Sequence, residues 1–280
     1  MLITFIGGGN MASALISGLA NPPRSDLRIR VVDPDDAARA RLRDTFDVPV
    51  FTDKETIGAI QGADVILLAI KPQTMPVVLN QLAGKVRSDQ LVLSIAAGTT
   101  IDTIRERLGR DIAVVRCMPN TPALIGHGIS GMTAGPDCSR QQLARAEEIL
   151  LAAGEVVWLD NEGLMDAVTA VSGTGPAYYF LLTEALAAAA RELGLPPHTA
   201  ERLAAITCFG AGAMMATSPD EAEELRRRVT SPGGTTEAAM AVLDSGGFRA
   251  LMEHAVTAAR DRSMELSGAP NLGEADKDAE

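Results

Sequence analysis

The sequence predicts an α/β protein: a doubly wound parallel sheet in residues 1–160, followed by an all-α domain in residues 161–266. Three observations support this fold class. Short β-like runs alternate with helical patterns in the first domain, as in consecutive βαβ units. A glycine-rich turn joins the first strand to the first helix. From residue 161 onward the apolar patterns are helical, and the acidic tail, residues 267–280, is predicted to be disordered.

The strands are predicted from short apolar runs. One of them, ADVILLAI, is almost continuously apolar, which is typical of a parallel strand buried on both faces. The runs are LITFI (2–6), LRIRVV (27–32), ADVILLAI (63–70), LVLSIAA (91–97), IAVVRCM (112–118), GISGMTA (128–134) and EVVWLD (155–160). Helices are expected at 11–19, 34–46, 75–82, 101–108 and 140–152, and in the second domain at 175–193, 197–217, 219–228, 235–244 and 248–266.

Two helices of the second domain are unusually apolar. PAYYFLLTEALAAAARELG (176–194) carries one charge, Glu184, before Arg191, and LAAITCFGAGAMMA (203–216) carries none. A helix that is apolar on all sides must be buried all round, and a small helical domain has little room for two of them. We therefore expect their outer faces to pack against a second copy of the chain, as an obligate dimer at least.

Composition excludes several function classes. The net charge of −11 disfavours nucleic-acid binding, because phosphate contacts need a basic face. The three cysteines are widely spaced and the three histidines are scattered, so the sequence predicts no metal site and no disulfide framework. The charge-free segment 203–219 of the second half is too short and too polar for a membrane span. With no basic leader at the N-terminus, we expect a cytoplasmic protein.

The turn GGGNMA (7–12) fits the pattern G-x-G-x-x-A between a strand and a helix, the context in which it predicts dinucleotide binding. Gly7 allows the tight turn, Gly9 lets the backbone approach a pyrophosphate, and Ala12 permits close packing of helix on strand. The helix N-terminus supplies free N–H groups. This turn makes the first domain Rossmann-type. Its candidate cofactor residues are Gly7, Gly8, Gly9, Asn10 and Met11.

Asp33 ends the second strand, close to the spacing of about 20 residues expected for the acid that binds the adenosine ribose. A carboxylate here accepts hydrogen bonds from a 2′-OH and repels a 2′-phosphate, which favours NADH over NADPH. Alternatively, Asp33 only caps the helix expected from Pro34, since proline suits the first helical position. The two roles are compatible.

Three later strands end in segments that suit a ligand, because ligands bind at the carboxyl ends of parallel strands. Small residues and prolines there predict a rigid, close-fitting wall for a nicotinamide. The candidate cofactor residues are Ile70, Lys71, Pro72, Ala97 and Asn120. Alternatively, Pro72 only starts a helix and Lys71 is a surface lysine.

Six segments follow one another along residues 1–266: GGGNMASALISG (7–18), IKPQ (70–73), SIAAGTTI (94–101), RCMPNTPALIGHG (116–128), DAVTAVSGTGPAYYF (166–180) and RRRVTSPGGTTEAAM (226–240). Together they resemble pyrroline-5-carboxylate reductases, and the last two are the most specific. The resemblance implies reduction of Δ1-pyrroline-5-carboxylate to L-proline by NADPH or NADH, the last step of proline biosynthesis. It also implies a helical dimerisation domain whose helices interleave in a homodimer, five of which often form a decamer.

The resemblance assigns site residues as well. Family cofactor positions fall on Gly7 to Met11, Ile70, Lys71 and Ala97. Family substrate positions fall on Glu162, Ser231, Thr235 and Thr236. Two residues depart from the family pattern. Asp53 stands where relatives often carry Asn near the adenosine, and Asp33 stands where NADPH-preferring relatives often carry a hydroxyl or basic residue.

Reduction of a cyclic imine needs a hydride on carbon and a proton on nitrogen, so it depends on positioning and electrostatics. A helix beginning at Gly233 and Gly234 presents free N–H groups to the substrate carboxylate. Ser231 and Thr235 add contacts there. Thr236 is the expected catalytic residue, its Oγ being the hydrogen-bond partner of the imine nitrogen, with the net proton supplied by solvent.

Other interpretations stay open at this point. SGTGP (172–176) is either a capped helix start or a ligand-lining segment, and Glu162 is either a surface acid or a pocket residue. A β-hydroxyacid dehydrogenase would need a lysine on a second-domain helix, but residues 86–276 contain none. A non-catalytic dinucleotide sensor is disfavoured by the intact SPGGTT and SGTGPAY segments.

Overall fold

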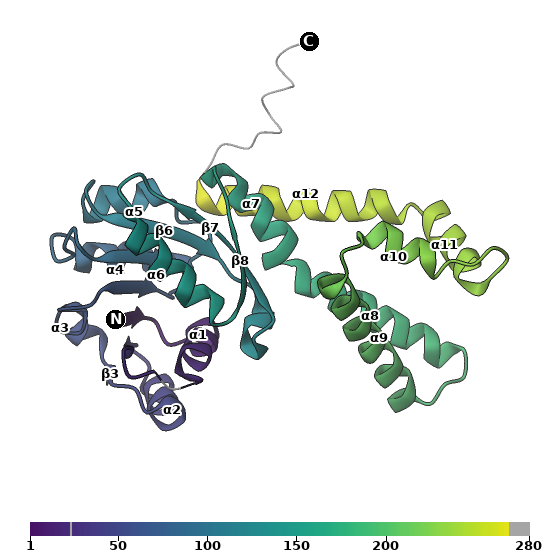
Figure 1. Cartoon of the computed structure of the whole chain (residues 1–280), viewed down its shortest axis with the longest axis horizontal. Coiled ribbons are helices and arrows are strands. Elements are labelled where there is room, and N and C mark those ends of the chain that lie inside the picture. The colour runs from purple at the N-terminus through teal and green to yellow at the C-terminus, as the bar shows by residue number, and fades with distance from the viewer. Residues whose placement is uncertain (23, 269–280) are drawn as a thin grey trace, which may run out of the picture. The chain divides into compact units, whose positions relative to one another are not determined.

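A computed structural model of the chain describes residues 1–22 and 24–268. They form two compact units, Met1–Thr174 with the end of the chain from Ala259, and Gly175–Ala258. The first unit is α/β and the second is helical, which confirms the predicted fold class (Figure 1). By packing, residues 161–174 belong to the first unit, whereas the sequence pattern groups them with the helical domain. The predicted tail lies outside the described residues from position 269 onward.

Among the described residues, an eight-stranded sheet forms the centre of the first unit, in the order β3-β2-β1-β4-β5-β6-β7-β8. Its strands are β1 (Leu2–Ile6), β2 (Arg28–Val32), β3 (Val50–Phe51), β4 (Val65–Leu68), β5 (Leu91–Ser94), β6 (Ala113–Met118), β7 (Gly128–Ala134) and β8 (Gly154–Trp158). β1 has β2 on one side and β4 on the other, so the strand order reverses there. Ligands bind at such a switch point, beyond the carboxyl ends of the strands.

The sheet departs from the predicted parallel arrangement at one pair. β7 runs antiparallel to β6, with Cys117 opposite Met132, while the other neighbouring strands are parallel. The connection between them, residues 119–127, holds only the short 3-10 helix Thr121–Ile125. A parallel crossover needs a dozen or more residues, so this connection is too short for one.

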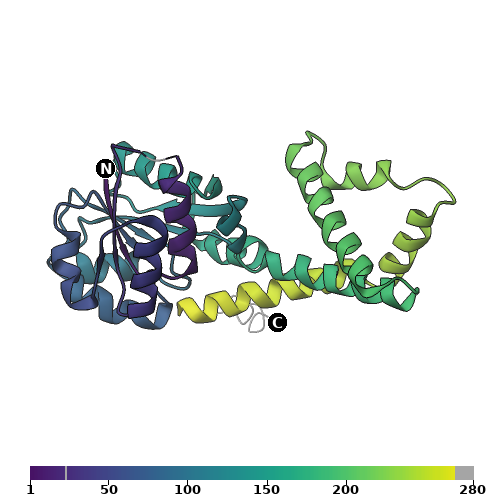
Figure 2. The same ribbon diagram turned by 90° about the horizontal axis from the view of Figure 1, so that it is seen from below.

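Helices cover both faces of the sheet (Figures 1 and 2). One face carries α1 (Asn10–Ala20), α2 (Asp36–Phe46) and α6 (Arg140–Leu151), and the other carries α3 (Thr56–Ile60), α4 (Met75–Leu82) and α5 (Ile101–Leu108). Side chains alternate along a strand, so Ile3 and Phe5 of β1 enter the first core and Leu2 and Ile6 enter the second. Full burial of each such side chain stabilises the fold by about 1.5–3 kcal/mol.

Two short elements, β3 and α3, are not predicted from the sequence. β3 pairs only with β2, through Val50 and Phe51. A strand of two residues is too short to show an alternating pattern, and a single helical turn such as α3 is too short to show a helical period. β3 is the outermost strand of the sheet, and α3 packs against β1 and β2.

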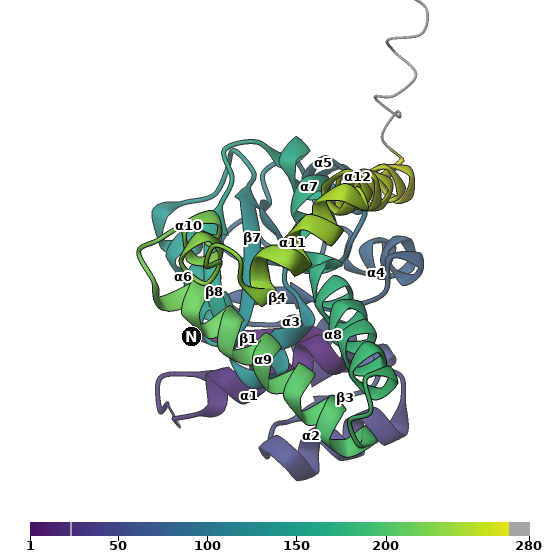
Figure 3. The same ribbon diagram turned by 90° about the vertical axis from the view of Figure 1, so that its right-hand side faces the viewer.

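The second unit is helical in the part of the chain that is described. It contains α8 (Gly175–Glu192), α9 (Pro197–Thr217), α10 (Ala222–Arg228), α11 (Thr235–Ser245) and the start of α12 (Phe248–Ser267). α8 and α9 lie side by side (Figure 3), and their buried residues are only Gly175, Ala187, Ala200 and Ala204. Within residues 1–22 and 24–268, no helix is both long enough and apolar enough to cross a bilayer.

The last turns of α12 pack on the first unit. Ser263, which is buried, donates its hydroxyl to Asp166 Oδ1 at 2.6 Å, and Asp166 lies on the short helix α7 (Met165–Val168). Gly98 has φ +70°, and a Cβ there would lie 2.9 Å from the carbonyl oxygen of Leu266. The loop after β5 is therefore packed closely against the end of α12.

Candidate active site

The glycine-rich turn between β1 and α1 has the geometry of a phosphate-binding loop. Gly7 has φ +102°, and a Cβ there would lie 2.3 Å from the carbonyl oxygen of Ala69. Gly9 is the N-cap of α1 and provides no side-chain cap, and a Cβ on it would meet nothing within 4 Å. The first-turn N–H groups of α1, from Asn10 and Met11 onward, are therefore uncapped beside an open space, as pyrophosphate binding requires.

Asp33 lies at the end of β2, and its carboxylate contacts this turn. Oδ2 accepts a hydrogen bond from the N–H of Gly8 at 2.7 Å, and Oδ1 accepts one from the N–H of Asp35 at 2.8 Å. The carboxylate is half-buried at the carboxyl edge of the sheet. This is the place expected for a ribose-binding acid.

The predicted capping role of Asp33 is wrong, as is the helix start at Pro34. Asp35 is the N-cap of α2, which begins at Asp36. The N–H of Asp33 is bonded to the carbonyl oxygen of Phe51 at 3.0 Å, so this residue still belongs to the strand ladder. Because Asp33 is bonded to the edge strand β3, the helix begins at Asp36 and not at Pro34.

Two arginines of α2 lie beside the same turn. Arg39 Nη1 donates to the carbonyl oxygen of Asp33 at 2.6 Å and also pairs with Asp36, and Arg41 Nη2 donates to the carbonyl oxygen of Gly8 at 3.1 Å. An arginine near this position accommodates the 2′-phosphate in NADP-binding folds. The surroundings of the glycine-rich turn thus combine one carboxylate with two guanidinium groups.

The ends of β4 and β5 meet the same edge. Ile70 lies against the glycine-rich turn, because a Cβ on Gly7 would lie 3.0 Å from Ile70 Cγ2. Pro72 begins a short 3-10 helix, so its helix-starting role is confirmed. Lys71 is exposed and makes no ion pair in the described part of the chain, and Ala97 is half-buried. Contact of these residues with a cofactor stays a prediction.

Asn120 is 8% exposed and has a structural partner. Its Oδ1 accepts a hydrogen bond from the N–H of Ile129 at 3.0 Å, which fixes the first residues of β7 beside the end of β6. Its predicted role at the cofactor is additional to this one and stays a prediction.

Glu162 is held by two donors at the carboxyl edge. Its Oε1 accepts hydrogen bonds from the N–H of Ile101, at the start of α5, and from Arg116 Nη1, each at 2.9 Å. The Arg116 side chain is 4% exposed and that of Glu162 is 28% exposed. Glu162 is therefore an anchored acid and not a free surface acid. Its role toward substrate stays a prediction.

The segment SGTGP is not a capped helix start. Residues Thr169–Gly173 form one turn of π-helix that follows α7 and leads into α8, so the chain is already helical where the start was expected. Ser172 Oγ donates to the carbonyl oxygen of Val168 at 2.9 Å, and a Cβ on Gly173 would lie 2.7 Å from Met118 Cε. Such π-turns occur frequently at functional sites.

In the second unit, the break between α10 and α11 forms an uncapped helix start. Gly234 is the N-cap of α11 and gives no side-chain cap, and Gly233 has φ +71°. A Cβ on Gly234 would lie 2.5 Å from Ser231 Oγ. Thr235 and Thr236 follow in the first turn, and their hydroxyls make no hydrogen bond to any described residue. Backbone N–H groups and two hydroxyls are therefore available to an anionic ligand.

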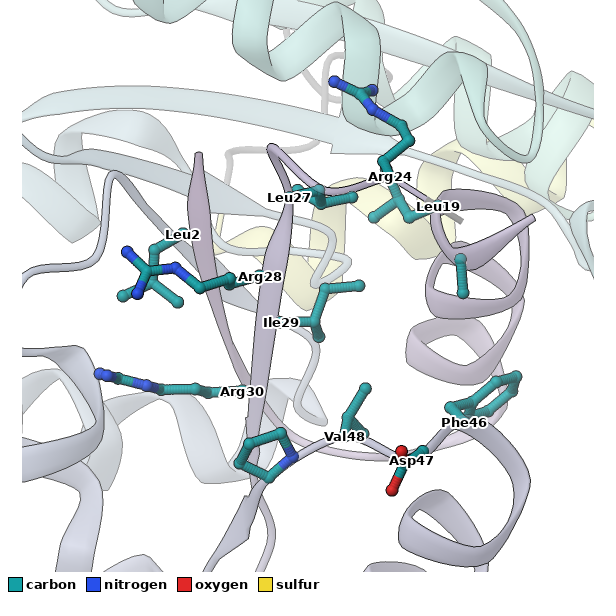
Figure 4. Close-up of a pocket in the computed structure, with 12 residues that line it drawn as sticks. Leu2, Leu19, Arg24, Leu27, Arg28, Ile29, Arg30, Phe46, Asp47 and Val48 are labelled. Atoms are coloured by element: carbon teal, nitrogen blue, oxygen red, sulfur yellow. The ribbon is translucent and has the colours of Figure 1, made fainter. Parts of the chain in front are cut away.

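A cavity of about 640 Å³ lies elsewhere in the first unit (Figure 4). Leu2, Arg28 and Ile29 line it at the amino ends of β1 and β2, together with Val48 before β3. Because the predicted cofactor residues stand at the carboxyl ends, this cavity is not the cofactor crevice. Within residues 1–22 and 24–268, no group of three or more His, Cys, Asp or Glu could hold a metal.

Two hydrogen-bonding residues of the candidate site, Arg116 and Glu237, were not predicted, although the sequence contains a signal for each. Arg116 is the single charge in the apolar strand IAVVRCM (112–118), and a buried charge needs a partner. Glu237 stands three residues after the N-cap Gly234, where an acid reaches back to the chain before the helix. Its Oε2 accepts a hydrogen bond from the N–H of Gly233 at 2.7 Å.

Comparison with known proteins decides the family. Residues 162–266 match the family described as pyrroline-5-carboxylate reductase dimerisation, and residues 2–98 match the one described as NADP oxidoreductase coenzyme F420-dependent. The pyrroline-5-carboxylate reductase of Pseudomonas aeruginosa is 46% identical, over 95% of this chain and 96% of that protein. The chain belongs to the pyrroline-5-carboxylate reductase family. It is therefore an enzyme, an oxidoreductase, and the predicted resemblance is confirmed.

Comparison with other members of the pyrroline-5-carboxylate reductase family supports the same assignment. The enzyme of Haemophilus influenzae is 40% identical, over 95% of this chain and 97% of that protein. A solved pyrroline-5-carboxylate reductase from Coxiella burnetii superposes with a TM-score of 0.87 at 39% identity, covering 95% of this chain and 98% of that one. The Plasmodium falciparum enzyme, solved with NADP bound, gives a TM-score of 0.82 at 27% identity, with the same coverage. Membership of this family sets aside the β-hydroxyacid dehydrogenase interpretation.

Proposed function

We propose that this chain reduces Δ1-pyrroline-5-carboxylate to L-proline by hydride transfer from NADPH or NADH, the last step of proline biosynthesis. The observation that carries the proposal is that one chain holds both a dinucleotide turn at Gly7–Met11 and an uncapped, hydroxyl-bearing helix start at Thr235 and Thr236. Membership of the reductase family supports it.

The test is direct. The purified chain is mixed with Δ1-pyrroline-5-carboxylate and each cofactor, oxidation of the cofactor is followed by absorbance, and the product is identified by mass spectrometry. Cofactor oxidation with formation of proline is expected. Absence of turnover with both cofactors, in a protein that still binds a dinucleotide, would reject the enzymatic role and favour a sensor.

The dinucleotide is assigned to the carboxyl edge of the first unit. The pyrophosphate would be held by Gly8, Gly9, Asn10 and Met11 at the start of α1, where the N–H groups are uncapped and the helix dipole is positive. The nicotinamide end would lie along the loops after β4, β5 and β6. Those loops carry the candidate residues Ile70, Lys71, Pro72, Ala97 and Asn120.

For the cofactor preference, Asp33 favours NADH. Its carboxylate is anchored by the N–H of Gly8 and stands where the ribose hydroxyls bind, so it repels a 2′-phosphate. Arg39 and Arg41 lie close by and reduce that repulsion. We expect both cofactors to be used, with NADH preferred, and the ratio of kcat/KM for the two cofactors measures this directly.

The substrate carboxylate is assigned to the start of α11. Gly233 and Gly234 keep side chains away from the backbone there, and the N–H groups of the first turn carry the positive end of the helix dipole. Ser231 and Thr235 add hydroxyl or N–H contacts. Glu162 is assigned to the substrate as well, through the carboxylate oxygen that has no protein partner.

Thr236 is the proposed catalytic residue. Its hydroxyl has no partner among the described residues, so it is available to the imine nitrogen. A nicotinamide bound to this chain would supply the hydride for the imine carbon. The electron pair of the C=N bond moves to nitrogen, which takes its proton from solvent before or during the transfer. Thr236 orients the imine through its nitrogen, a positioning effect that lowers the barrier.

We propose that the chain works as a homodimer. α8 and α9 expose large apolar side chains, including Tyr179, Phe180, Leu181 and Phe209, each between 54% and 67% exposed. Large exposed apolar side chains in such number favour a protein interface, and the family match over residues 162–266 is to a dimerisation domain. Assembly of five dimers into a decamer, and a location in the cytoplasm, are further expectations. The mass in solution, measured by light scattering, tests the assembly.

A further inference from the structure

Arg116 is a buried charge with a single protein partner. It lies on β6, two residues along from Val114, and alternation places both on the sheet face that carries α5. Its Nη1 donates to Glu162 Oε1 at 2.9 Å. Nε and Nη2 donate to no group in residues 1–22 and 24–268. A guanidinium placed in an apolar strand is costly unless it is paired, and Glu162 supplies that pair.

Glu162 links that guanidinium to the loop on the cofactor side. The same Oε1 atom accepts a hydrogen bond from the N–H of Ile101, the first residue of α5. α5 follows directly on the loop that contains Ala97 and Gly98, and Gly98 is packed against Leu266. One carboxylate oxygen is therefore held by a cation and by a helix N-terminus at once, which fixes its position.

The other oxygen of Glu162 is unoccupied by protein. Oε2 accepts no hydrogen bond from any described residue, and the side chain is 28% exposed, so solvent or a ligand reaches it. A carboxylate with one oxygen anchored and one oxygen free is a preorganised acceptor. It can bind a donor or a positive charge without a loss of side-chain freedom.

We propose that Arg116 is a positioning residue, which acts through Glu162 to present Oε2 to the nitrogen-bearing end of the substrate. The inference rests on the proposed substrate role of Glu162. Without the guanidinium, the Glu162 side chain loses the donor that determines its rotamer, although the N–H of Ile101 remains. We therefore expect kcat/KM for the imine to fall, whereas the affinity for the dinucleotide at the glycine-rich turn changes little.

The experiment is a double-mutant cycle on the full-length enzyme, with Arg116→Met, Glu162→Gln and the double variant. Each variant is assayed for kcat and KM for Δ1-pyrroline-5-carboxylate, and for the Kd of the dinucleotide by fluorescence titration. Loss of a charge-assisted hydrogen bond predicts a fall of about 10- to 100-fold in kcat/KM for the imine. Arg116→Lys keeps the positive charge, so it is the variant to use if Arg116→Met does not fold. Its loss of kcat/KM for the imine should be smaller than that of Arg116→Met.

The control is Arg105→Met. Arg105 lies on α5, is also largely buried, and pairs with Asp137, in the loop after β7 at the amino edge of the sheet. It matches Arg116 in residue type, burial and ion pairing, and differs in the edge that it faces. We expect wild-type kinetics for this variant even if its melting temperature falls.

The double variant decides between the alternatives. If Arg116 acts through Glu162, the double variant is no worse than Glu162→Gln alone, and the dinucleotide Kd stays within about threefold of wild type. Multiplicative losses in the double variant would show that Arg116 acts elsewhere and would overturn the proposal. So would wild-type kinetics in Arg116→Met, or equal losses in imine use and dinucleotide binding. Wild-type kinetics in Glu162→Gln alone would instead remove the substrate role of Glu162, and the proposal with it.

Discussion

The N–H of Gly8 donates to Asp33 Oδ2 at 2.7 Å, so the acid at the end of β2 is bonded directly to the glycine-rich turn. A change at Asp33 therefore alters both the charge at the proposed ribose site and one hydrogen bond of the turn. The cofactor ratio reports the first effect, and stability reports the second.

Replacing Asp33 by Ser should move preference toward NADPH. Removal of the carboxylate abolishes its repulsion of a 2′-phosphate and leaves Arg39 and Arg41 nearby, so the NADPH/NADH ratio of kcat/KM should rise by about tenfold or more. Steady-state kinetics with both cofactors measure this. Asp35→Ala is the matched control: it removes the cap of α2 at a cost of about 1 kcal/mol and should leave the ratio unchanged. An unchanged ratio in Asp33→Ser would mean that Asp33 only braces the turn.

Thr236→Val should impair catalysis without affecting folding. The variant keeps the shape of the side chain and removes the hydroxyl assigned to the imine nitrogen, so kcat/KM should fall by about 100-fold. Thr230→Val tests the same change nearby, where the hydroxyl donates to the carbonyl oxygen of Arg226 at 2.7 Å. We expect that control to retain activity. Kinetics of Thr236→Val equal to those of wild type would remove its assigned role.

Gly98→Ala should destabilise the first unit more than Gly62→Ala. Both glycines have φ close to +70°, so each substitution carries a backbone cost of about 1 kcal/mol. A Cβ on Gly98 also meets the carbonyl oxygen of Leu266 at 2.9 Å, whereas a Cβ on Gly62 meets nothing within 4 Å. Urea unfolding should therefore show an extra loss of about 1–3 kcal/mol for Gly98→Ala. Equal losses would contradict the close packing of α12 on this loop.

Phe209→Glu should disrupt self-association. Phe209 is 67% exposed on α9, and a charge placed in a buried apolar interface is costly. Light scattering after size-exclusion chromatography should show a smaller particle than wild type. Val77→Glu, at a 68% exposed position of the first unit, is the matched control and should keep the wild-type mass. A Phe209→Glu protein of unchanged mass would place the interface elsewhere.

Cys117 should make stability depend on alkaline pH. Burial raises the pKa of the Cys117 thiol above its ordinary range, so the native thiol stays neutral where the unfolded one ionises. Its contribution is constant below about pH 8.5 and is lost as pH rises further, by up to about 1.4 kcal/mol per pH unit. The free energy of unfolding in urea, measured at pH 7.5 and 9.5, tests this. The part of its decrease at pH 9.5 that comes from Cys117 should be absent in Cys117→Ala. The same loss in both proteins would assign it to other groups.

Much of the first unit could be predicted because its signals are local. The run ADVILLAI predicts a buried strand, and the turn at residues 7–12 predicts the start of α1. The predicted helix start at Pro34 was wrong. The N–H of Asp33 is bonded to Phe51, which lies in a strand, β3, that the sequence pattern does not reveal. The antiparallel β7 follows from the length of the connection at residues 119–127, which a strand-by-strand prediction does not weigh.

The residues of the candidate site also divide into those that motifs predict and those that motifs do not predict. The resemblance in motifs places Glu162, Ser231 and Thr236 on named positions, and family membership is confirmed by comparison. No local pattern pairs Arg116 with Glu162, which are 46 positions apart in the chain.

By itself, the sequence determined the fold class, the family and the positions of the two glycine-rich segments, since periodicity, turn chemistry and motif order are properties of neighbouring residues. Only the tertiary structure decided that Asp33 contacts Gly8, that Arg116 anchors Glu162, and that Leu266 lies against Gly98. Those contacts join residues far apart in the chain, and their geometry depends on how strands and helices pack.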